Sequence, residues 1–506
     1  MGLGLEINKL LNESFQDLPI PDIRESKVIH FTKIGTHQFS NHEIALIDTP
    51  FVQRLKYISQ LGLAYNVFPT ARHTRFEHSL GVTIMIDKMW RSLNENQQFE
   101  FIRSEEDRNQ LLIKLRVAAI LHDIGHCPFS HVSEEVIRDD PSIRRESDKF
   151  SCKPHEAIAY HMIRSDTFRA FFEDLSKFYH ISVEPDEISN LIVGKVDCPD
   201  EDQYMADMLN GQFDADKLDY ITRDSDFSGV TLALGVDRLL LSLGIADTPC
   251  YKSTQRKLVL YEKGILPMEQ ILIAKVMLFS SIYHHQKVRA IDKMVIPLMR
   301  RIIERKIEIR GQEISSHLDL LKVDDFDILN LASKDPIICR MCNSIKLRKT
   351  FKRALVISPK TMDKNGNEDY SVPLGKLLEL GENPDDVRKI SISLAEYIGN
   401  GCSEFNVAID IPTTPKLGEM TQKVIQIHEN FISLSEIFHN GWLESYTANK
   451  WKGHIFAEED CRVSAQKKGK KFLEELFDLK FNKYAEIEAK VNPPYIKQQY
   501  TLSDFN

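Results

Sequence analysis

The sequence predicts a mainly α protein in which a helical core is followed by a C-terminal lobe of mixed α and β structure. Apolar residues recur at three- and four-residue spacing through residues 41–310, which is typical of amphipathic helices. Beyond that region, apolar runs at residues 354–357 and 405–411 are typical of strands. The 506 residues are 42% hydrophobic and 27% charged, a globular composition that excludes disorder for most of the chain.

These patterns divide the chain into three segments. Residues 1–40 are expected to form an N-terminal arm with a hairpin-like stretch at residues 28–34. Residues 41–310 are expected to form the helical core, whose clearest helix spans residues 111–121. Residues 311–506 are expected to form the α+β lobe. Because this lobe offers no obvious catalytic residues, we assign it to oligomerisation or regulation.

The charge balance and the cysteines limit the class of protein. The 65 Lys and Arg against 74 Asp and Glu leave a net charge of −9, which argues against a general nucleic-acid-coating protein. There is no run of about 18 apolar residues, so we expect no membrane helix. Eight unevenly spaced cysteines fit reduced thiols, and we therefore expect a cytoplasmic protein.

Three segments, at residues 73–82, 121–131 and 213–224, are unusually rich in histidine and acids. His122 and Asp123 lie at the expected end of a helix, where the chain turns and both side chains can converge on one ion. Imidazole and carboxylate ligands suit Mn, Fe, Zn or Ni better than Ca. Two His and two Asp would leave coordination positions open for water and a phosphate oxygen, as in catalytic sites. Any one of these histidines alone could be a satisfied core residue, so the argument rests on the three segments together.

These segments resemble the HD superfamily of metal-dependent phosphohydrolases. More narrowly, they resemble the dNTP triphosphohydrolase branch, which includes the vertebrate enzyme with SAM and HD domains, although no SAM domain is recognisable at the N-terminus. The similarity covers about half the chain, roughly from residue 48 to residue 293. The matching motifs lie at residues 49–55, 60–62, 67–69, 75–82, 122–126, 128–131, 155–156 and 214–220, and at Tyr283 and His285.

The resemblance implies a role for each matching residue. The metal ligands would be His78, His122, Asp123 and Asp216, holding one divalent transition metal (Fe, Mn, Zn or Ni). The reaction centre would contain Arg75 as a phosphate contact, together with His126, His131 and His155, with His131 as the acid for the leaving 5′ oxygen. The substrate contacts would be Gln60, Lys217, Tyr220, Asp224, Lys275 and Tyr283. The reaction would yield a deoxynucleoside and tripolyphosphate, with Mg accompanying the nucleotide. The relatives also imply a homo-oligomer, either a dimer or a tetramer.

Elementary chemistry supports these roles. A triphosphate needs cationic partners, and Arg75 offers a bidentate fork. The 5′ alkoxide is a poor leaving group, so a histidine that titrates near neutrality can donate the proton it needs. The chain departs from the family at Lys275, where Arg is usual, and at Gln286, where Lys is usual. Asp214 and Asp219 are interpreted as structural carboxylates that bond either the backbone or an Arg. His73 stays open between a substrate contact and a solvated loop residue.

Two alternatives remain open. One is an HD-type nuclease or phosphodiesterase that acts on single-stranded nucleic acid, a partner that is possible but not indicated at this net charge. The other is a nucleotide-binding sensor or scaffold that has kept the pocket. Guanosine tetraphosphate hydrolases are disfavoured because His126 and Cys127 stand where they carry an acidic pair, and the chain contains no Gly-Tyr-Pro segment of the HD-GYP enzymes.

Overall fold

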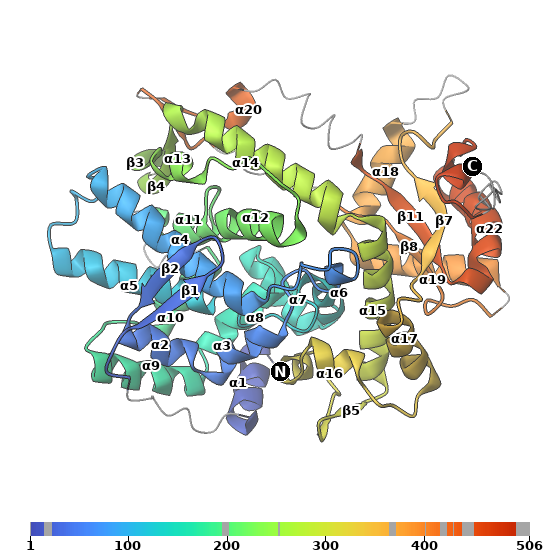
Figure 1. Cartoon of the computed structure of the whole chain (residues 1–506), viewed down its shortest axis with the longest axis horizontal. Coiled ribbons are helices and arrows are strands. Elements are labelled where there is room, and N and C mark those ends of the chain that lie inside the picture. The colour runs from blue at the N-terminus through green and yellow to red at the C-terminus, as the bar shows by residue number, and fades with distance from the viewer. Residues whose placement is uncertain are drawn as a thin grey trace, which may run out of the picture. The chain divides into compact units, whose positions relative to one another are not determined.

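The computed structural model describes residues 2–14, 23–194, 202–250, 253–363, 371–399, 401–414, 423–428, 430–437 and 450–491. The chain forms two compact units, which are described separately (Figure 1). Unit 1 comprises Met1–Tyr283, Met299–Lys334 and Lys416–Asn440, and unit 2 comprises His284–Leu298, Asp335–Pro415 and Gly441–Asn506. Helices dominate the fold, which confirms the mainly α class. The predicted segment boundaries after residues 40 and 310 stay a prediction.

Unit 1 is built mostly of helices. Its α-helices are α1 (Leu3–Ser14), α2 (Asn41–Ile47), α3 (Pro50–Gln53), α4 (Arg75–Glu95), α5 (Glu105–Leu121), α6 (His131–Ile137), α7 (Pro141–Phe150), α8 (Pro154–Ile163), α9 (Asp166–Tyr179), α10 (Pro185–Ile192), α11 (Gln203–Asn210), α12 (Ala215–Ser228), α13 (Val236–Leu240), α14 (Ile265–Leu278), α16 (Asp325–Leu329) and α20 (Leu434–Ile437). Helix α15 (Gln286–Glu304) runs through both units.

Strands form smaller parts of unit 1. The hairpin predicted at residues 28–34 is longer than expected, with β1 (Lys27–Phe31) paired antiparallel to β2 (Gly35–Phe39). A four-stranded sheet has the order β10-β9-β4-β3. Its strands are β3 (Leu243–Cys250), β4 (Ser253–Tyr261), β9 (Ile425–Ile427) and β10 (Asn430–Ile432), and a short pair joins β5 (Glu308–Ile309) to β6 (Gln312–Glu313).

Local signals in the sequence set the ends of the helices that carry the site. Helix α4 begins after Thr74, whose backbone N donates to the Glu77 carboxylate at 2.7 Å, as in a capping box. Helix α12 begins after Asp214, whose carboxylate accepts from the Lys217 backbone N, and it ends at Gly229 in the left-handed conformation. Asp214 is therefore a structural carboxylate, as the sequence predicts.

One segment of unit 1, Glu262–Tyr283, is long and apolar enough to cross a membrane. It comprises a 3-10 turn, α14 and the π-helical turn Phe279–Tyr283. Half of its most apolar window is buried inside the structure, and the core helix of a water-soluble protein passes the same test of length and composition. The absence of a membrane helix stays a prediction.

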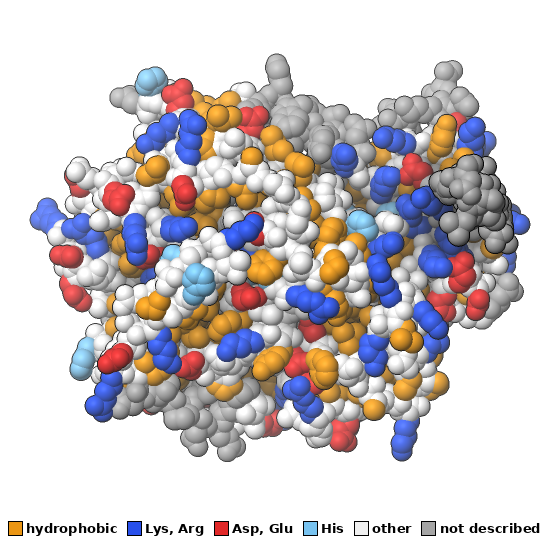
Figure 2. Space-filling view, in the orientation of Figure 1, with side chains coloured by type: hydrophobic (Ala, Val, Ile, Leu, Met, Phe, Trp, Pro, Cys, Tyr) orange, Lys and Arg blue, Asp and Glu red, His pale blue; other side chains and the backbone are white. Residues whose placement is uncertain are grey.

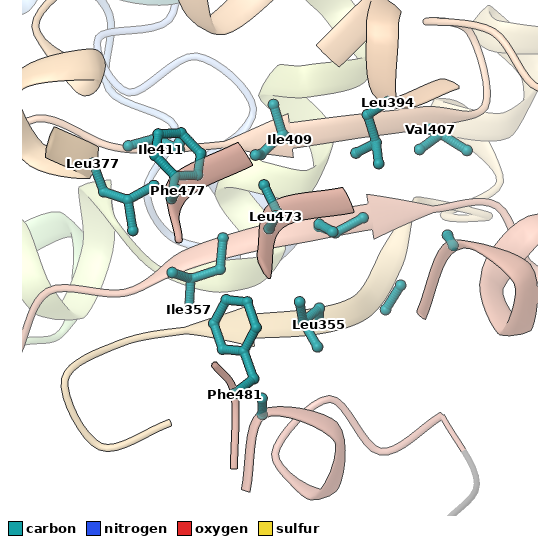
Figure 3. Packing of buried hydrophobic residues seen from close by; sticks show 14 of the residues in the cluster. Leu355, Ile357, Leu377, Leu394, Val407, Ile409, Ile411, Leu473, Phe477 and Phe481 are labelled. Carbon is teal, nitrogen blue, oxygen red and sulfur yellow. The ribbon is translucent and has the colours of Figure 1, made fainter. Parts of the chain in front are cut away.

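Unit 2 packs helices against a three-stranded antiparallel sheet of order β7-β11-β8. Its strands are β7 (Lys352–Ile357), β8 (Val407–Asp410) and β11 (Gly453–Ala457), so both predicted strand runs form strands. Its helices are α17 (Pro336–Lys346), α18 (Ser371–Gly381), α19 (Pro384–Ile398), α22 (Glu459–Phe477) and α23 (Tyr484–Ile487). Figure 3 shows the apolar core between sheet and helices, where Leu355, Ile409 and Leu473 are at most 1% exposed.

Candidate metal centre and active site

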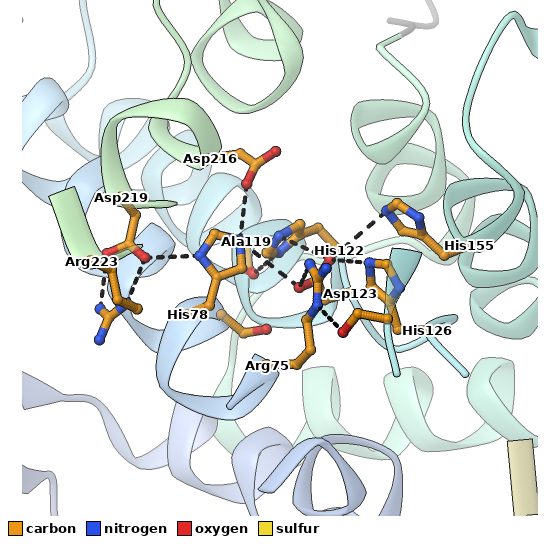
Figure 4. A network of polar contacts seen from close by, with 12 residues as sticks. Arg75, His78, Ala119, His122, Asp123, His126, His155, Asp216, Asp219 and Arg223 are labelled. Atoms are coloured by element: carbon orange, nitrogen blue, oxygen red, sulfur yellow. Dashed lines mark hydrogen bonds and ion pairs between the residues drawn. The ribbon is translucent and has the colours of Figure 1, made fainter. Parts of the chain in front are cut away.

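Four predicted ligands from three separate helices come together in unit 1 (Figure 4). His78 lies on α4, His122 and Asp123 lie at the end of α5, and Asp216 lies in the first turn of α12. Ligand atoms of His78, His122 and Asp123 all lie within 4.8 Å of one another. Asp216 Oδ1 lies 2.9 Å from His78 Nε2, and two ligands each about 2.1 Å from one ion lie at a similar separation.

The hydrogen bonds of the two imidazoles leave the right atoms for a metal. His78 Nδ1 lies 2.8 Å from Asp219 Oδ2, and His122 Nδ1 lies 2.7 Å from the Ala119 carbonyl oxygen. These contacts make Nδ1 the donor in each ring and leave the Nε2 lone pair for an ion. Both Nε2 atoms are buried. That of His78 faces the carboxylate of Asp216, another predicted ligand, at 2.9 Å, and that of His122 makes no hydrogen bond within the described residues. The donor set therefore fits a divalent transition metal.

A buried ion pair of Asp219 and Arg223 orients the His78 ring through its Nδ1 atom. Arg223 Nε and Nη2 donate to the two carboxylate oxygens of Asp219, at 2.8 and 2.9 Å. Gly81 makes room for this pair, because a Cβ at that position would lie 2.1 Å from both Arg223 Nη2 and Asp219 Oδ1. Burial lowers the pKa of His78, but hydrogen bonds to Asp216 and Asp219 outweigh it and raise the pKa to about 9. Asp219 is thus a structural carboxylate bonded to Arg, as predicted.

Arg75 connects Asp123 to the turn that follows it through two hydrogen bonds. Its Nη1 donates to Asp123 Oδ2 at 2.9 Å and its Nε donates to Ser130 Oγ at 2.9 Å. Burial raises the pKa of Asp123, but the charges of Arg75, His122 and His126 outweigh it and hold the pKa well below its usual range. Arg75 Nη2 is buried and makes no hydrogen bond within the described residues, so it is available to an anionic group.

A second cluster lies beside the first and contains a residue that the sequence analysis missed. Ligand atoms of His126, His131, Glu134 and His155 lie within 4.8 Å of one another. Glu134 Oε1 lies 3.0 Å from His131 Nδ1 and 2.5 Å from His155 Nδ1. The His126 ring stacks on His155 with centroids 3.7 Å apart. The signal for Glu134 was its i,i+3 spacing from His131 at the start of α6.

The second cluster is suited to proton transfer. Burial raises the pKa of Glu134, but the imidazoles of His131 and His155 outweigh it and hold the pKa well below its usual range. An ionised Glu134 fixes Nδ1 of His131 as the donor toward the carboxylate and leaves Nε2 facing away from it. The His131 side chain is 54% exposed, so a substrate can reach it.

Three of the predicted substrate contacts, Gln60, Asp224 and Tyr283, lie around His73. Asp224 Oδ1 lies 2.7 Å from His73 Nε2, and Asp224 Oδ2 accepts from the Tyr283 hydroxyl at 2.5 Å. The Gln60 backbone N donates to the His73 carbonyl at 3.0 Å, and its buried Oε1 has no hydrogen bond within the described residues. His73 is buried, so the solvated-loop interpretation of this residue is wrong.

The other predicted substrate contacts are placed less directly. Lys217 Nζ lies 2.5 Å from Asp214 Oδ2 and 2.7 Å from the Gly211 carbonyl oxygen, so its charge is already partly matched. Lys275 is buried on α14. Tyr220 is half-buried on α12. Substrate binding by these three residues stays a prediction.

Two family matches extend over most of the chain. The HD domain family matches residues 75–224, and the family described as an HD associated region matches residues 249–483. These matches identify the chain as an HD-domain phosphohydrolase, and its clustered His and Asp side chains could hold a divalent metal. The resemblance drawn from the sequence is confirmed.

The more particular similarity is to the deoxynucleoside triphosphate triphosphohydrolase SAMHD1. The Bos taurus protein is 29% identical over 321 residues, covering 60% of this chain and 51% of that protein. The Homo sapiens protein is 28% identical over 359 residues, covering 65% and 54%. The chain thus spans about half the length of these curated relatives. A hypothetical protein from Aquifex aeolicus shares the fold, with a TM-score of 0.61 at 22% identity over 88% of this chain and 100% of that one.

Proposed function

We propose that this chain hydrolyses deoxynucleoside triphosphates to a deoxynucleoside and tripolyphosphate, by attack of water on the α-phosphate. The observation that carries the proposal is the convergence of the buried Nε2 atoms of His78 and His122 with the Asp123 carboxylate, beside an Nη2 of Arg75 that makes no hydrogen bond within the described residues. This arrangement offers a cation site and an anion contact to the same ligand. The name of the SAMHD1 relatives points to the same substrate class, although this chain spans only about half of their length.

In this proposal, His78, His122, Asp123 and Asp216 hold one ion of Fe, Mn, Zn or Ni. When bound, such an ion supplies Lewis-acid polarisation of the phosphate and lowers the pKa of a bound water. Arg75 Nη2 donates to a phosphate oxygen and thereby opposes the charge that develops in the transition state. Mg accompanies the nucleotide.

His131 is the proposed general acid. Glu134 holds its Nδ1 at 3.0 Å, so a proton on Nε2 can pass to the departing 5′ oxygen while the carboxylate stabilises the imidazolium. Gln60, Asp224 and Tyr283 contact the sugar, and Tyr220 forms part of the wall that would meet a 2′-hydroxyl. We also propose that the protein acts as a cytoplasmic homo-oligomer, because its eight unevenly spaced cysteines fit reduced thiols and because the family resemblance implies assembly.

Figure 2 bears on the nuclease alternative. Basic and acidic side chains of the described residues are interspersed on the face that it shows, and the net charge is −9. A strand-binding protein uses a continuous basic groove, so neither observation favours a nucleic-acid substrate.

The test is product identification in water enriched in oxygen-18. The metal-loaded protein is incubated with a dNTP or with single-stranded DNA, and the products are separated by chromatography. The proposal expects deoxynucleoside and tripolyphosphate, with the label in the tripolyphosphate because water attacks phosphorus. Pyrophosphate with a monophosphate, label in the deoxynucleoside, or cleavage of the DNA alone would refute it. Binding of dNTP without any product would instead favour the sensor alternative.

A further inference from the structure

We propose that Asp325, on α16 in the HD-associated region, is a positioning residue of the active site that holds the turn between Asp123 and His131. The inference rests on the proposed function for its catalytic consequence but not for its geometry. Asp325 lies about 100 residues or more along the chain from the His and Asp motifs at residues 73–82, 121–131 and 213–224. Its carboxylate is 7% exposed and belongs to unit 1, as do all the residues it contacts.

The turn itself requires support. It joins α5 to α6 and carries Asp123, His126 and His131 within nine residues. Phe129 and Ser130 both have positive φ, at 63° and 55°. Ser130 combines that φ with a ψ of −123°, a region that residues other than glycine rarely adopt. Two consecutive L residues keep such a conformation only where their surroundings hold it.

Asp325 supplies that support through two backbone amides. Its Oδ1 accepts from the Phe129 backbone N at 2.7 Å, and its Oδ2 accepts from the Ser59 backbone N at 3.0 Å. The first amide belongs to the strained turn and the second immediately precedes Gln60. The Asp325 carboxylate therefore joins the turn between Asp123 and His131 to the loop that carries Gln60, a predicted substrate contact.

Hydrogen bonds continue from these two amides to the metal ligands. Ser130 Oγ donates to the Ser59 carbonyl at 2.6 Å and accepts from Arg75 Nε at 2.9 Å. Arg75 Nη1 in turn donates to Asp123 Oδ2. A displacement of the Ser59 and Phe129 backbones would pass through Ser130 to Arg75 and from there to Asp123.

A cation holds the same turn through its carbonyls. Arg54 Nη1 donates to the Ile124 carbonyl at 3.1 Å, and Arg54 Nη2 donates to the His126 carbonyl at 2.8 Å. The turn is thus held by Arg54 on two carbonyl groups and by Asp325 on an amide. The neutral isostere at position 325 cannot replace the carboxylate, because an asparagine would turn its NH₂ group toward one of the two amide N–H groups.

Burial favours the neutral, protonated form of Asp325. Burial raises the pKa of Asp325 to about 6, although hydrogen bonds from the Phe129 and Ser59 backbones oppose the shift. A side chain that only filled space at this point could be neutral. The retention of a buried carboxylate is consistent with a geometric requirement at the turn.

The test compares Asp325→Asn and Asp325→Ala with Asp327→Asn as a matched control. Asp327 is also a buried carboxylate on α16, but it bonds the Asp324 backbone N and Arg310 instead of the turn. For both position-325 variants we expect kcat with dNTP to fall about 10- to 100-fold with a smaller change in KM, because a displaced reacting group loses rate before it loses binding. Metal content should stay at the wild-type level, and Asp327→Asn should keep the wild-type kcat.

Two further measurements do not depend on dNTP hydrolysis. Hydrogen–deuterium exchange should become faster at the amides of Ser59 and Phe129 in both position-325 variants and not in Asp327→Asn. The visible absorption bands of the cobalt(II)-loaded protein should shift in the same two variants, since Asp123 is reoriented. Unchanged exchange would show that Asp325 does not hold the Ser59 and Phe129 amides. Faster exchange with unchanged kcat and an unchanged cobalt spectrum would show that holding them does not position the active site. If the wild type hydrolyses no dNTP, the proposed function fails and the exchange and cobalt measurements still decide this inference.

Arg54→Lys tests the opposite side of the turn. Lysine keeps the charge but cannot donate to two carbonyls in the fixed geometry of a guanidinium. We expect faster exchange at His126 and the residues that follow it, with a loss of kcat in the same direction as Asp325→Asn. Exchange and kcat equal to wild type would show that Arg54 does not take part in holding the turn.

Discussion

The metal pocket of unit 1 and the core of unit 2 use burial in opposite ways. In the pocket, buried side chains keep polar atoms that make no hydrogen bond within the described residues, among them Nε2 of His122 and Nη2 of Arg75. In unit 2, the core between sheet and helices is apolar, and Leu355, Ile409 and Leu473 are at most 1% exposed. An unbonded buried polar atom costs stability, whereas a buried leucine contributes it. This difference is what a binding site in the first region and a stabilising core in the second would produce.

The largest expected effect is at the metal pocket. Asp216→Asn should lower dNTP hydrolysis by about 1,000-fold or more and should remove most of the bound metal, because one anionic ligand is lost from the set. The measurement is kcat together with metal analysis of the purified protein. Asp237→Asn, at an exposed carboxylate on α13 of unit 1, is the control. Full metal content in Asp216→Asn would mean that the ligand set is wrongly assigned.

Leu355→Ala tests the other side of the comparison. Removing a fully buried leucine from β7 should lower the free energy of unfolding by about 2–5 kcal/mol, through lost burial and the cavity that remains. The measurement is denaturant unfolding, with metal analysis of the native protein. The metal content of Leu355→Ala should match that of the wild type. A loss of metal as large as that of Asp216→Asn would show that the core of unit 2 is also needed for metal binding.

Two glycines sharpen the comparison. Gly81→Ala places a Cβ 2.1 Å from the Asp219–Arg223 pair, whereas Gly469→Ala in unit 2 places one 2.6 Å from the Ile455 Cδ1 atom. The first change disturbs the carboxylate that orients His78, and it should weaken metal binding about 10- to 100-fold. The second meets the end of a flexible side chain and should change stability alone. Metal titrations of the two variants check this, and equal metal affinities would contradict it.

The smallest expected effect is a pH dependence in unit 2. Asp410 accepts from Arg289 Nη2 and Nε, at 2.5 and 3.2 Å, and the Arg289 charge, with His454 and Lys293, outweighs burial and lowers the pKa of Asp410. A lowered pKa contributes stability above the ordinary value of 3.8, and that stability is lost as the pH falls. Between pH 6 and pH 3 the wild type should therefore lose about 1 kcal/mol more unfolding free energy than Asp410→Asn, as measured by denaturant unfolding at the two pH values.

Much of the site could be predicted because its ligands lie in short motifs. His122 and Asp123 are adjacent, and Arg75 and His78 lie three residues apart on one helix face. The capping residues Thr74 and Asp214 mark where the helices that carry them begin. Asp219 was correctly predicted to be a structural carboxylate, and of the two partners left open, backbone or Arg, the structure has Arg223. Glu134 was missed because its i,i+3 spacing from His131 is a weak signal, and its second partner, His155, lies 21 residues away along the chain.

The amino-acid sequence by itself determined the helical class of this protein, the ends of its main helices and the residue types of the metal site, because helix periodicity, capping and motif spacing act over a few residues. Only the tertiary structure decided that Asp325 reaches Ser59, 266 residues away, and that Gly81 leaves space for the Asp219–Arg223 pair. Contacts of that kind depend on how whole helices pack. No local pattern records them, since the two partners meet only after the chain between them has folded.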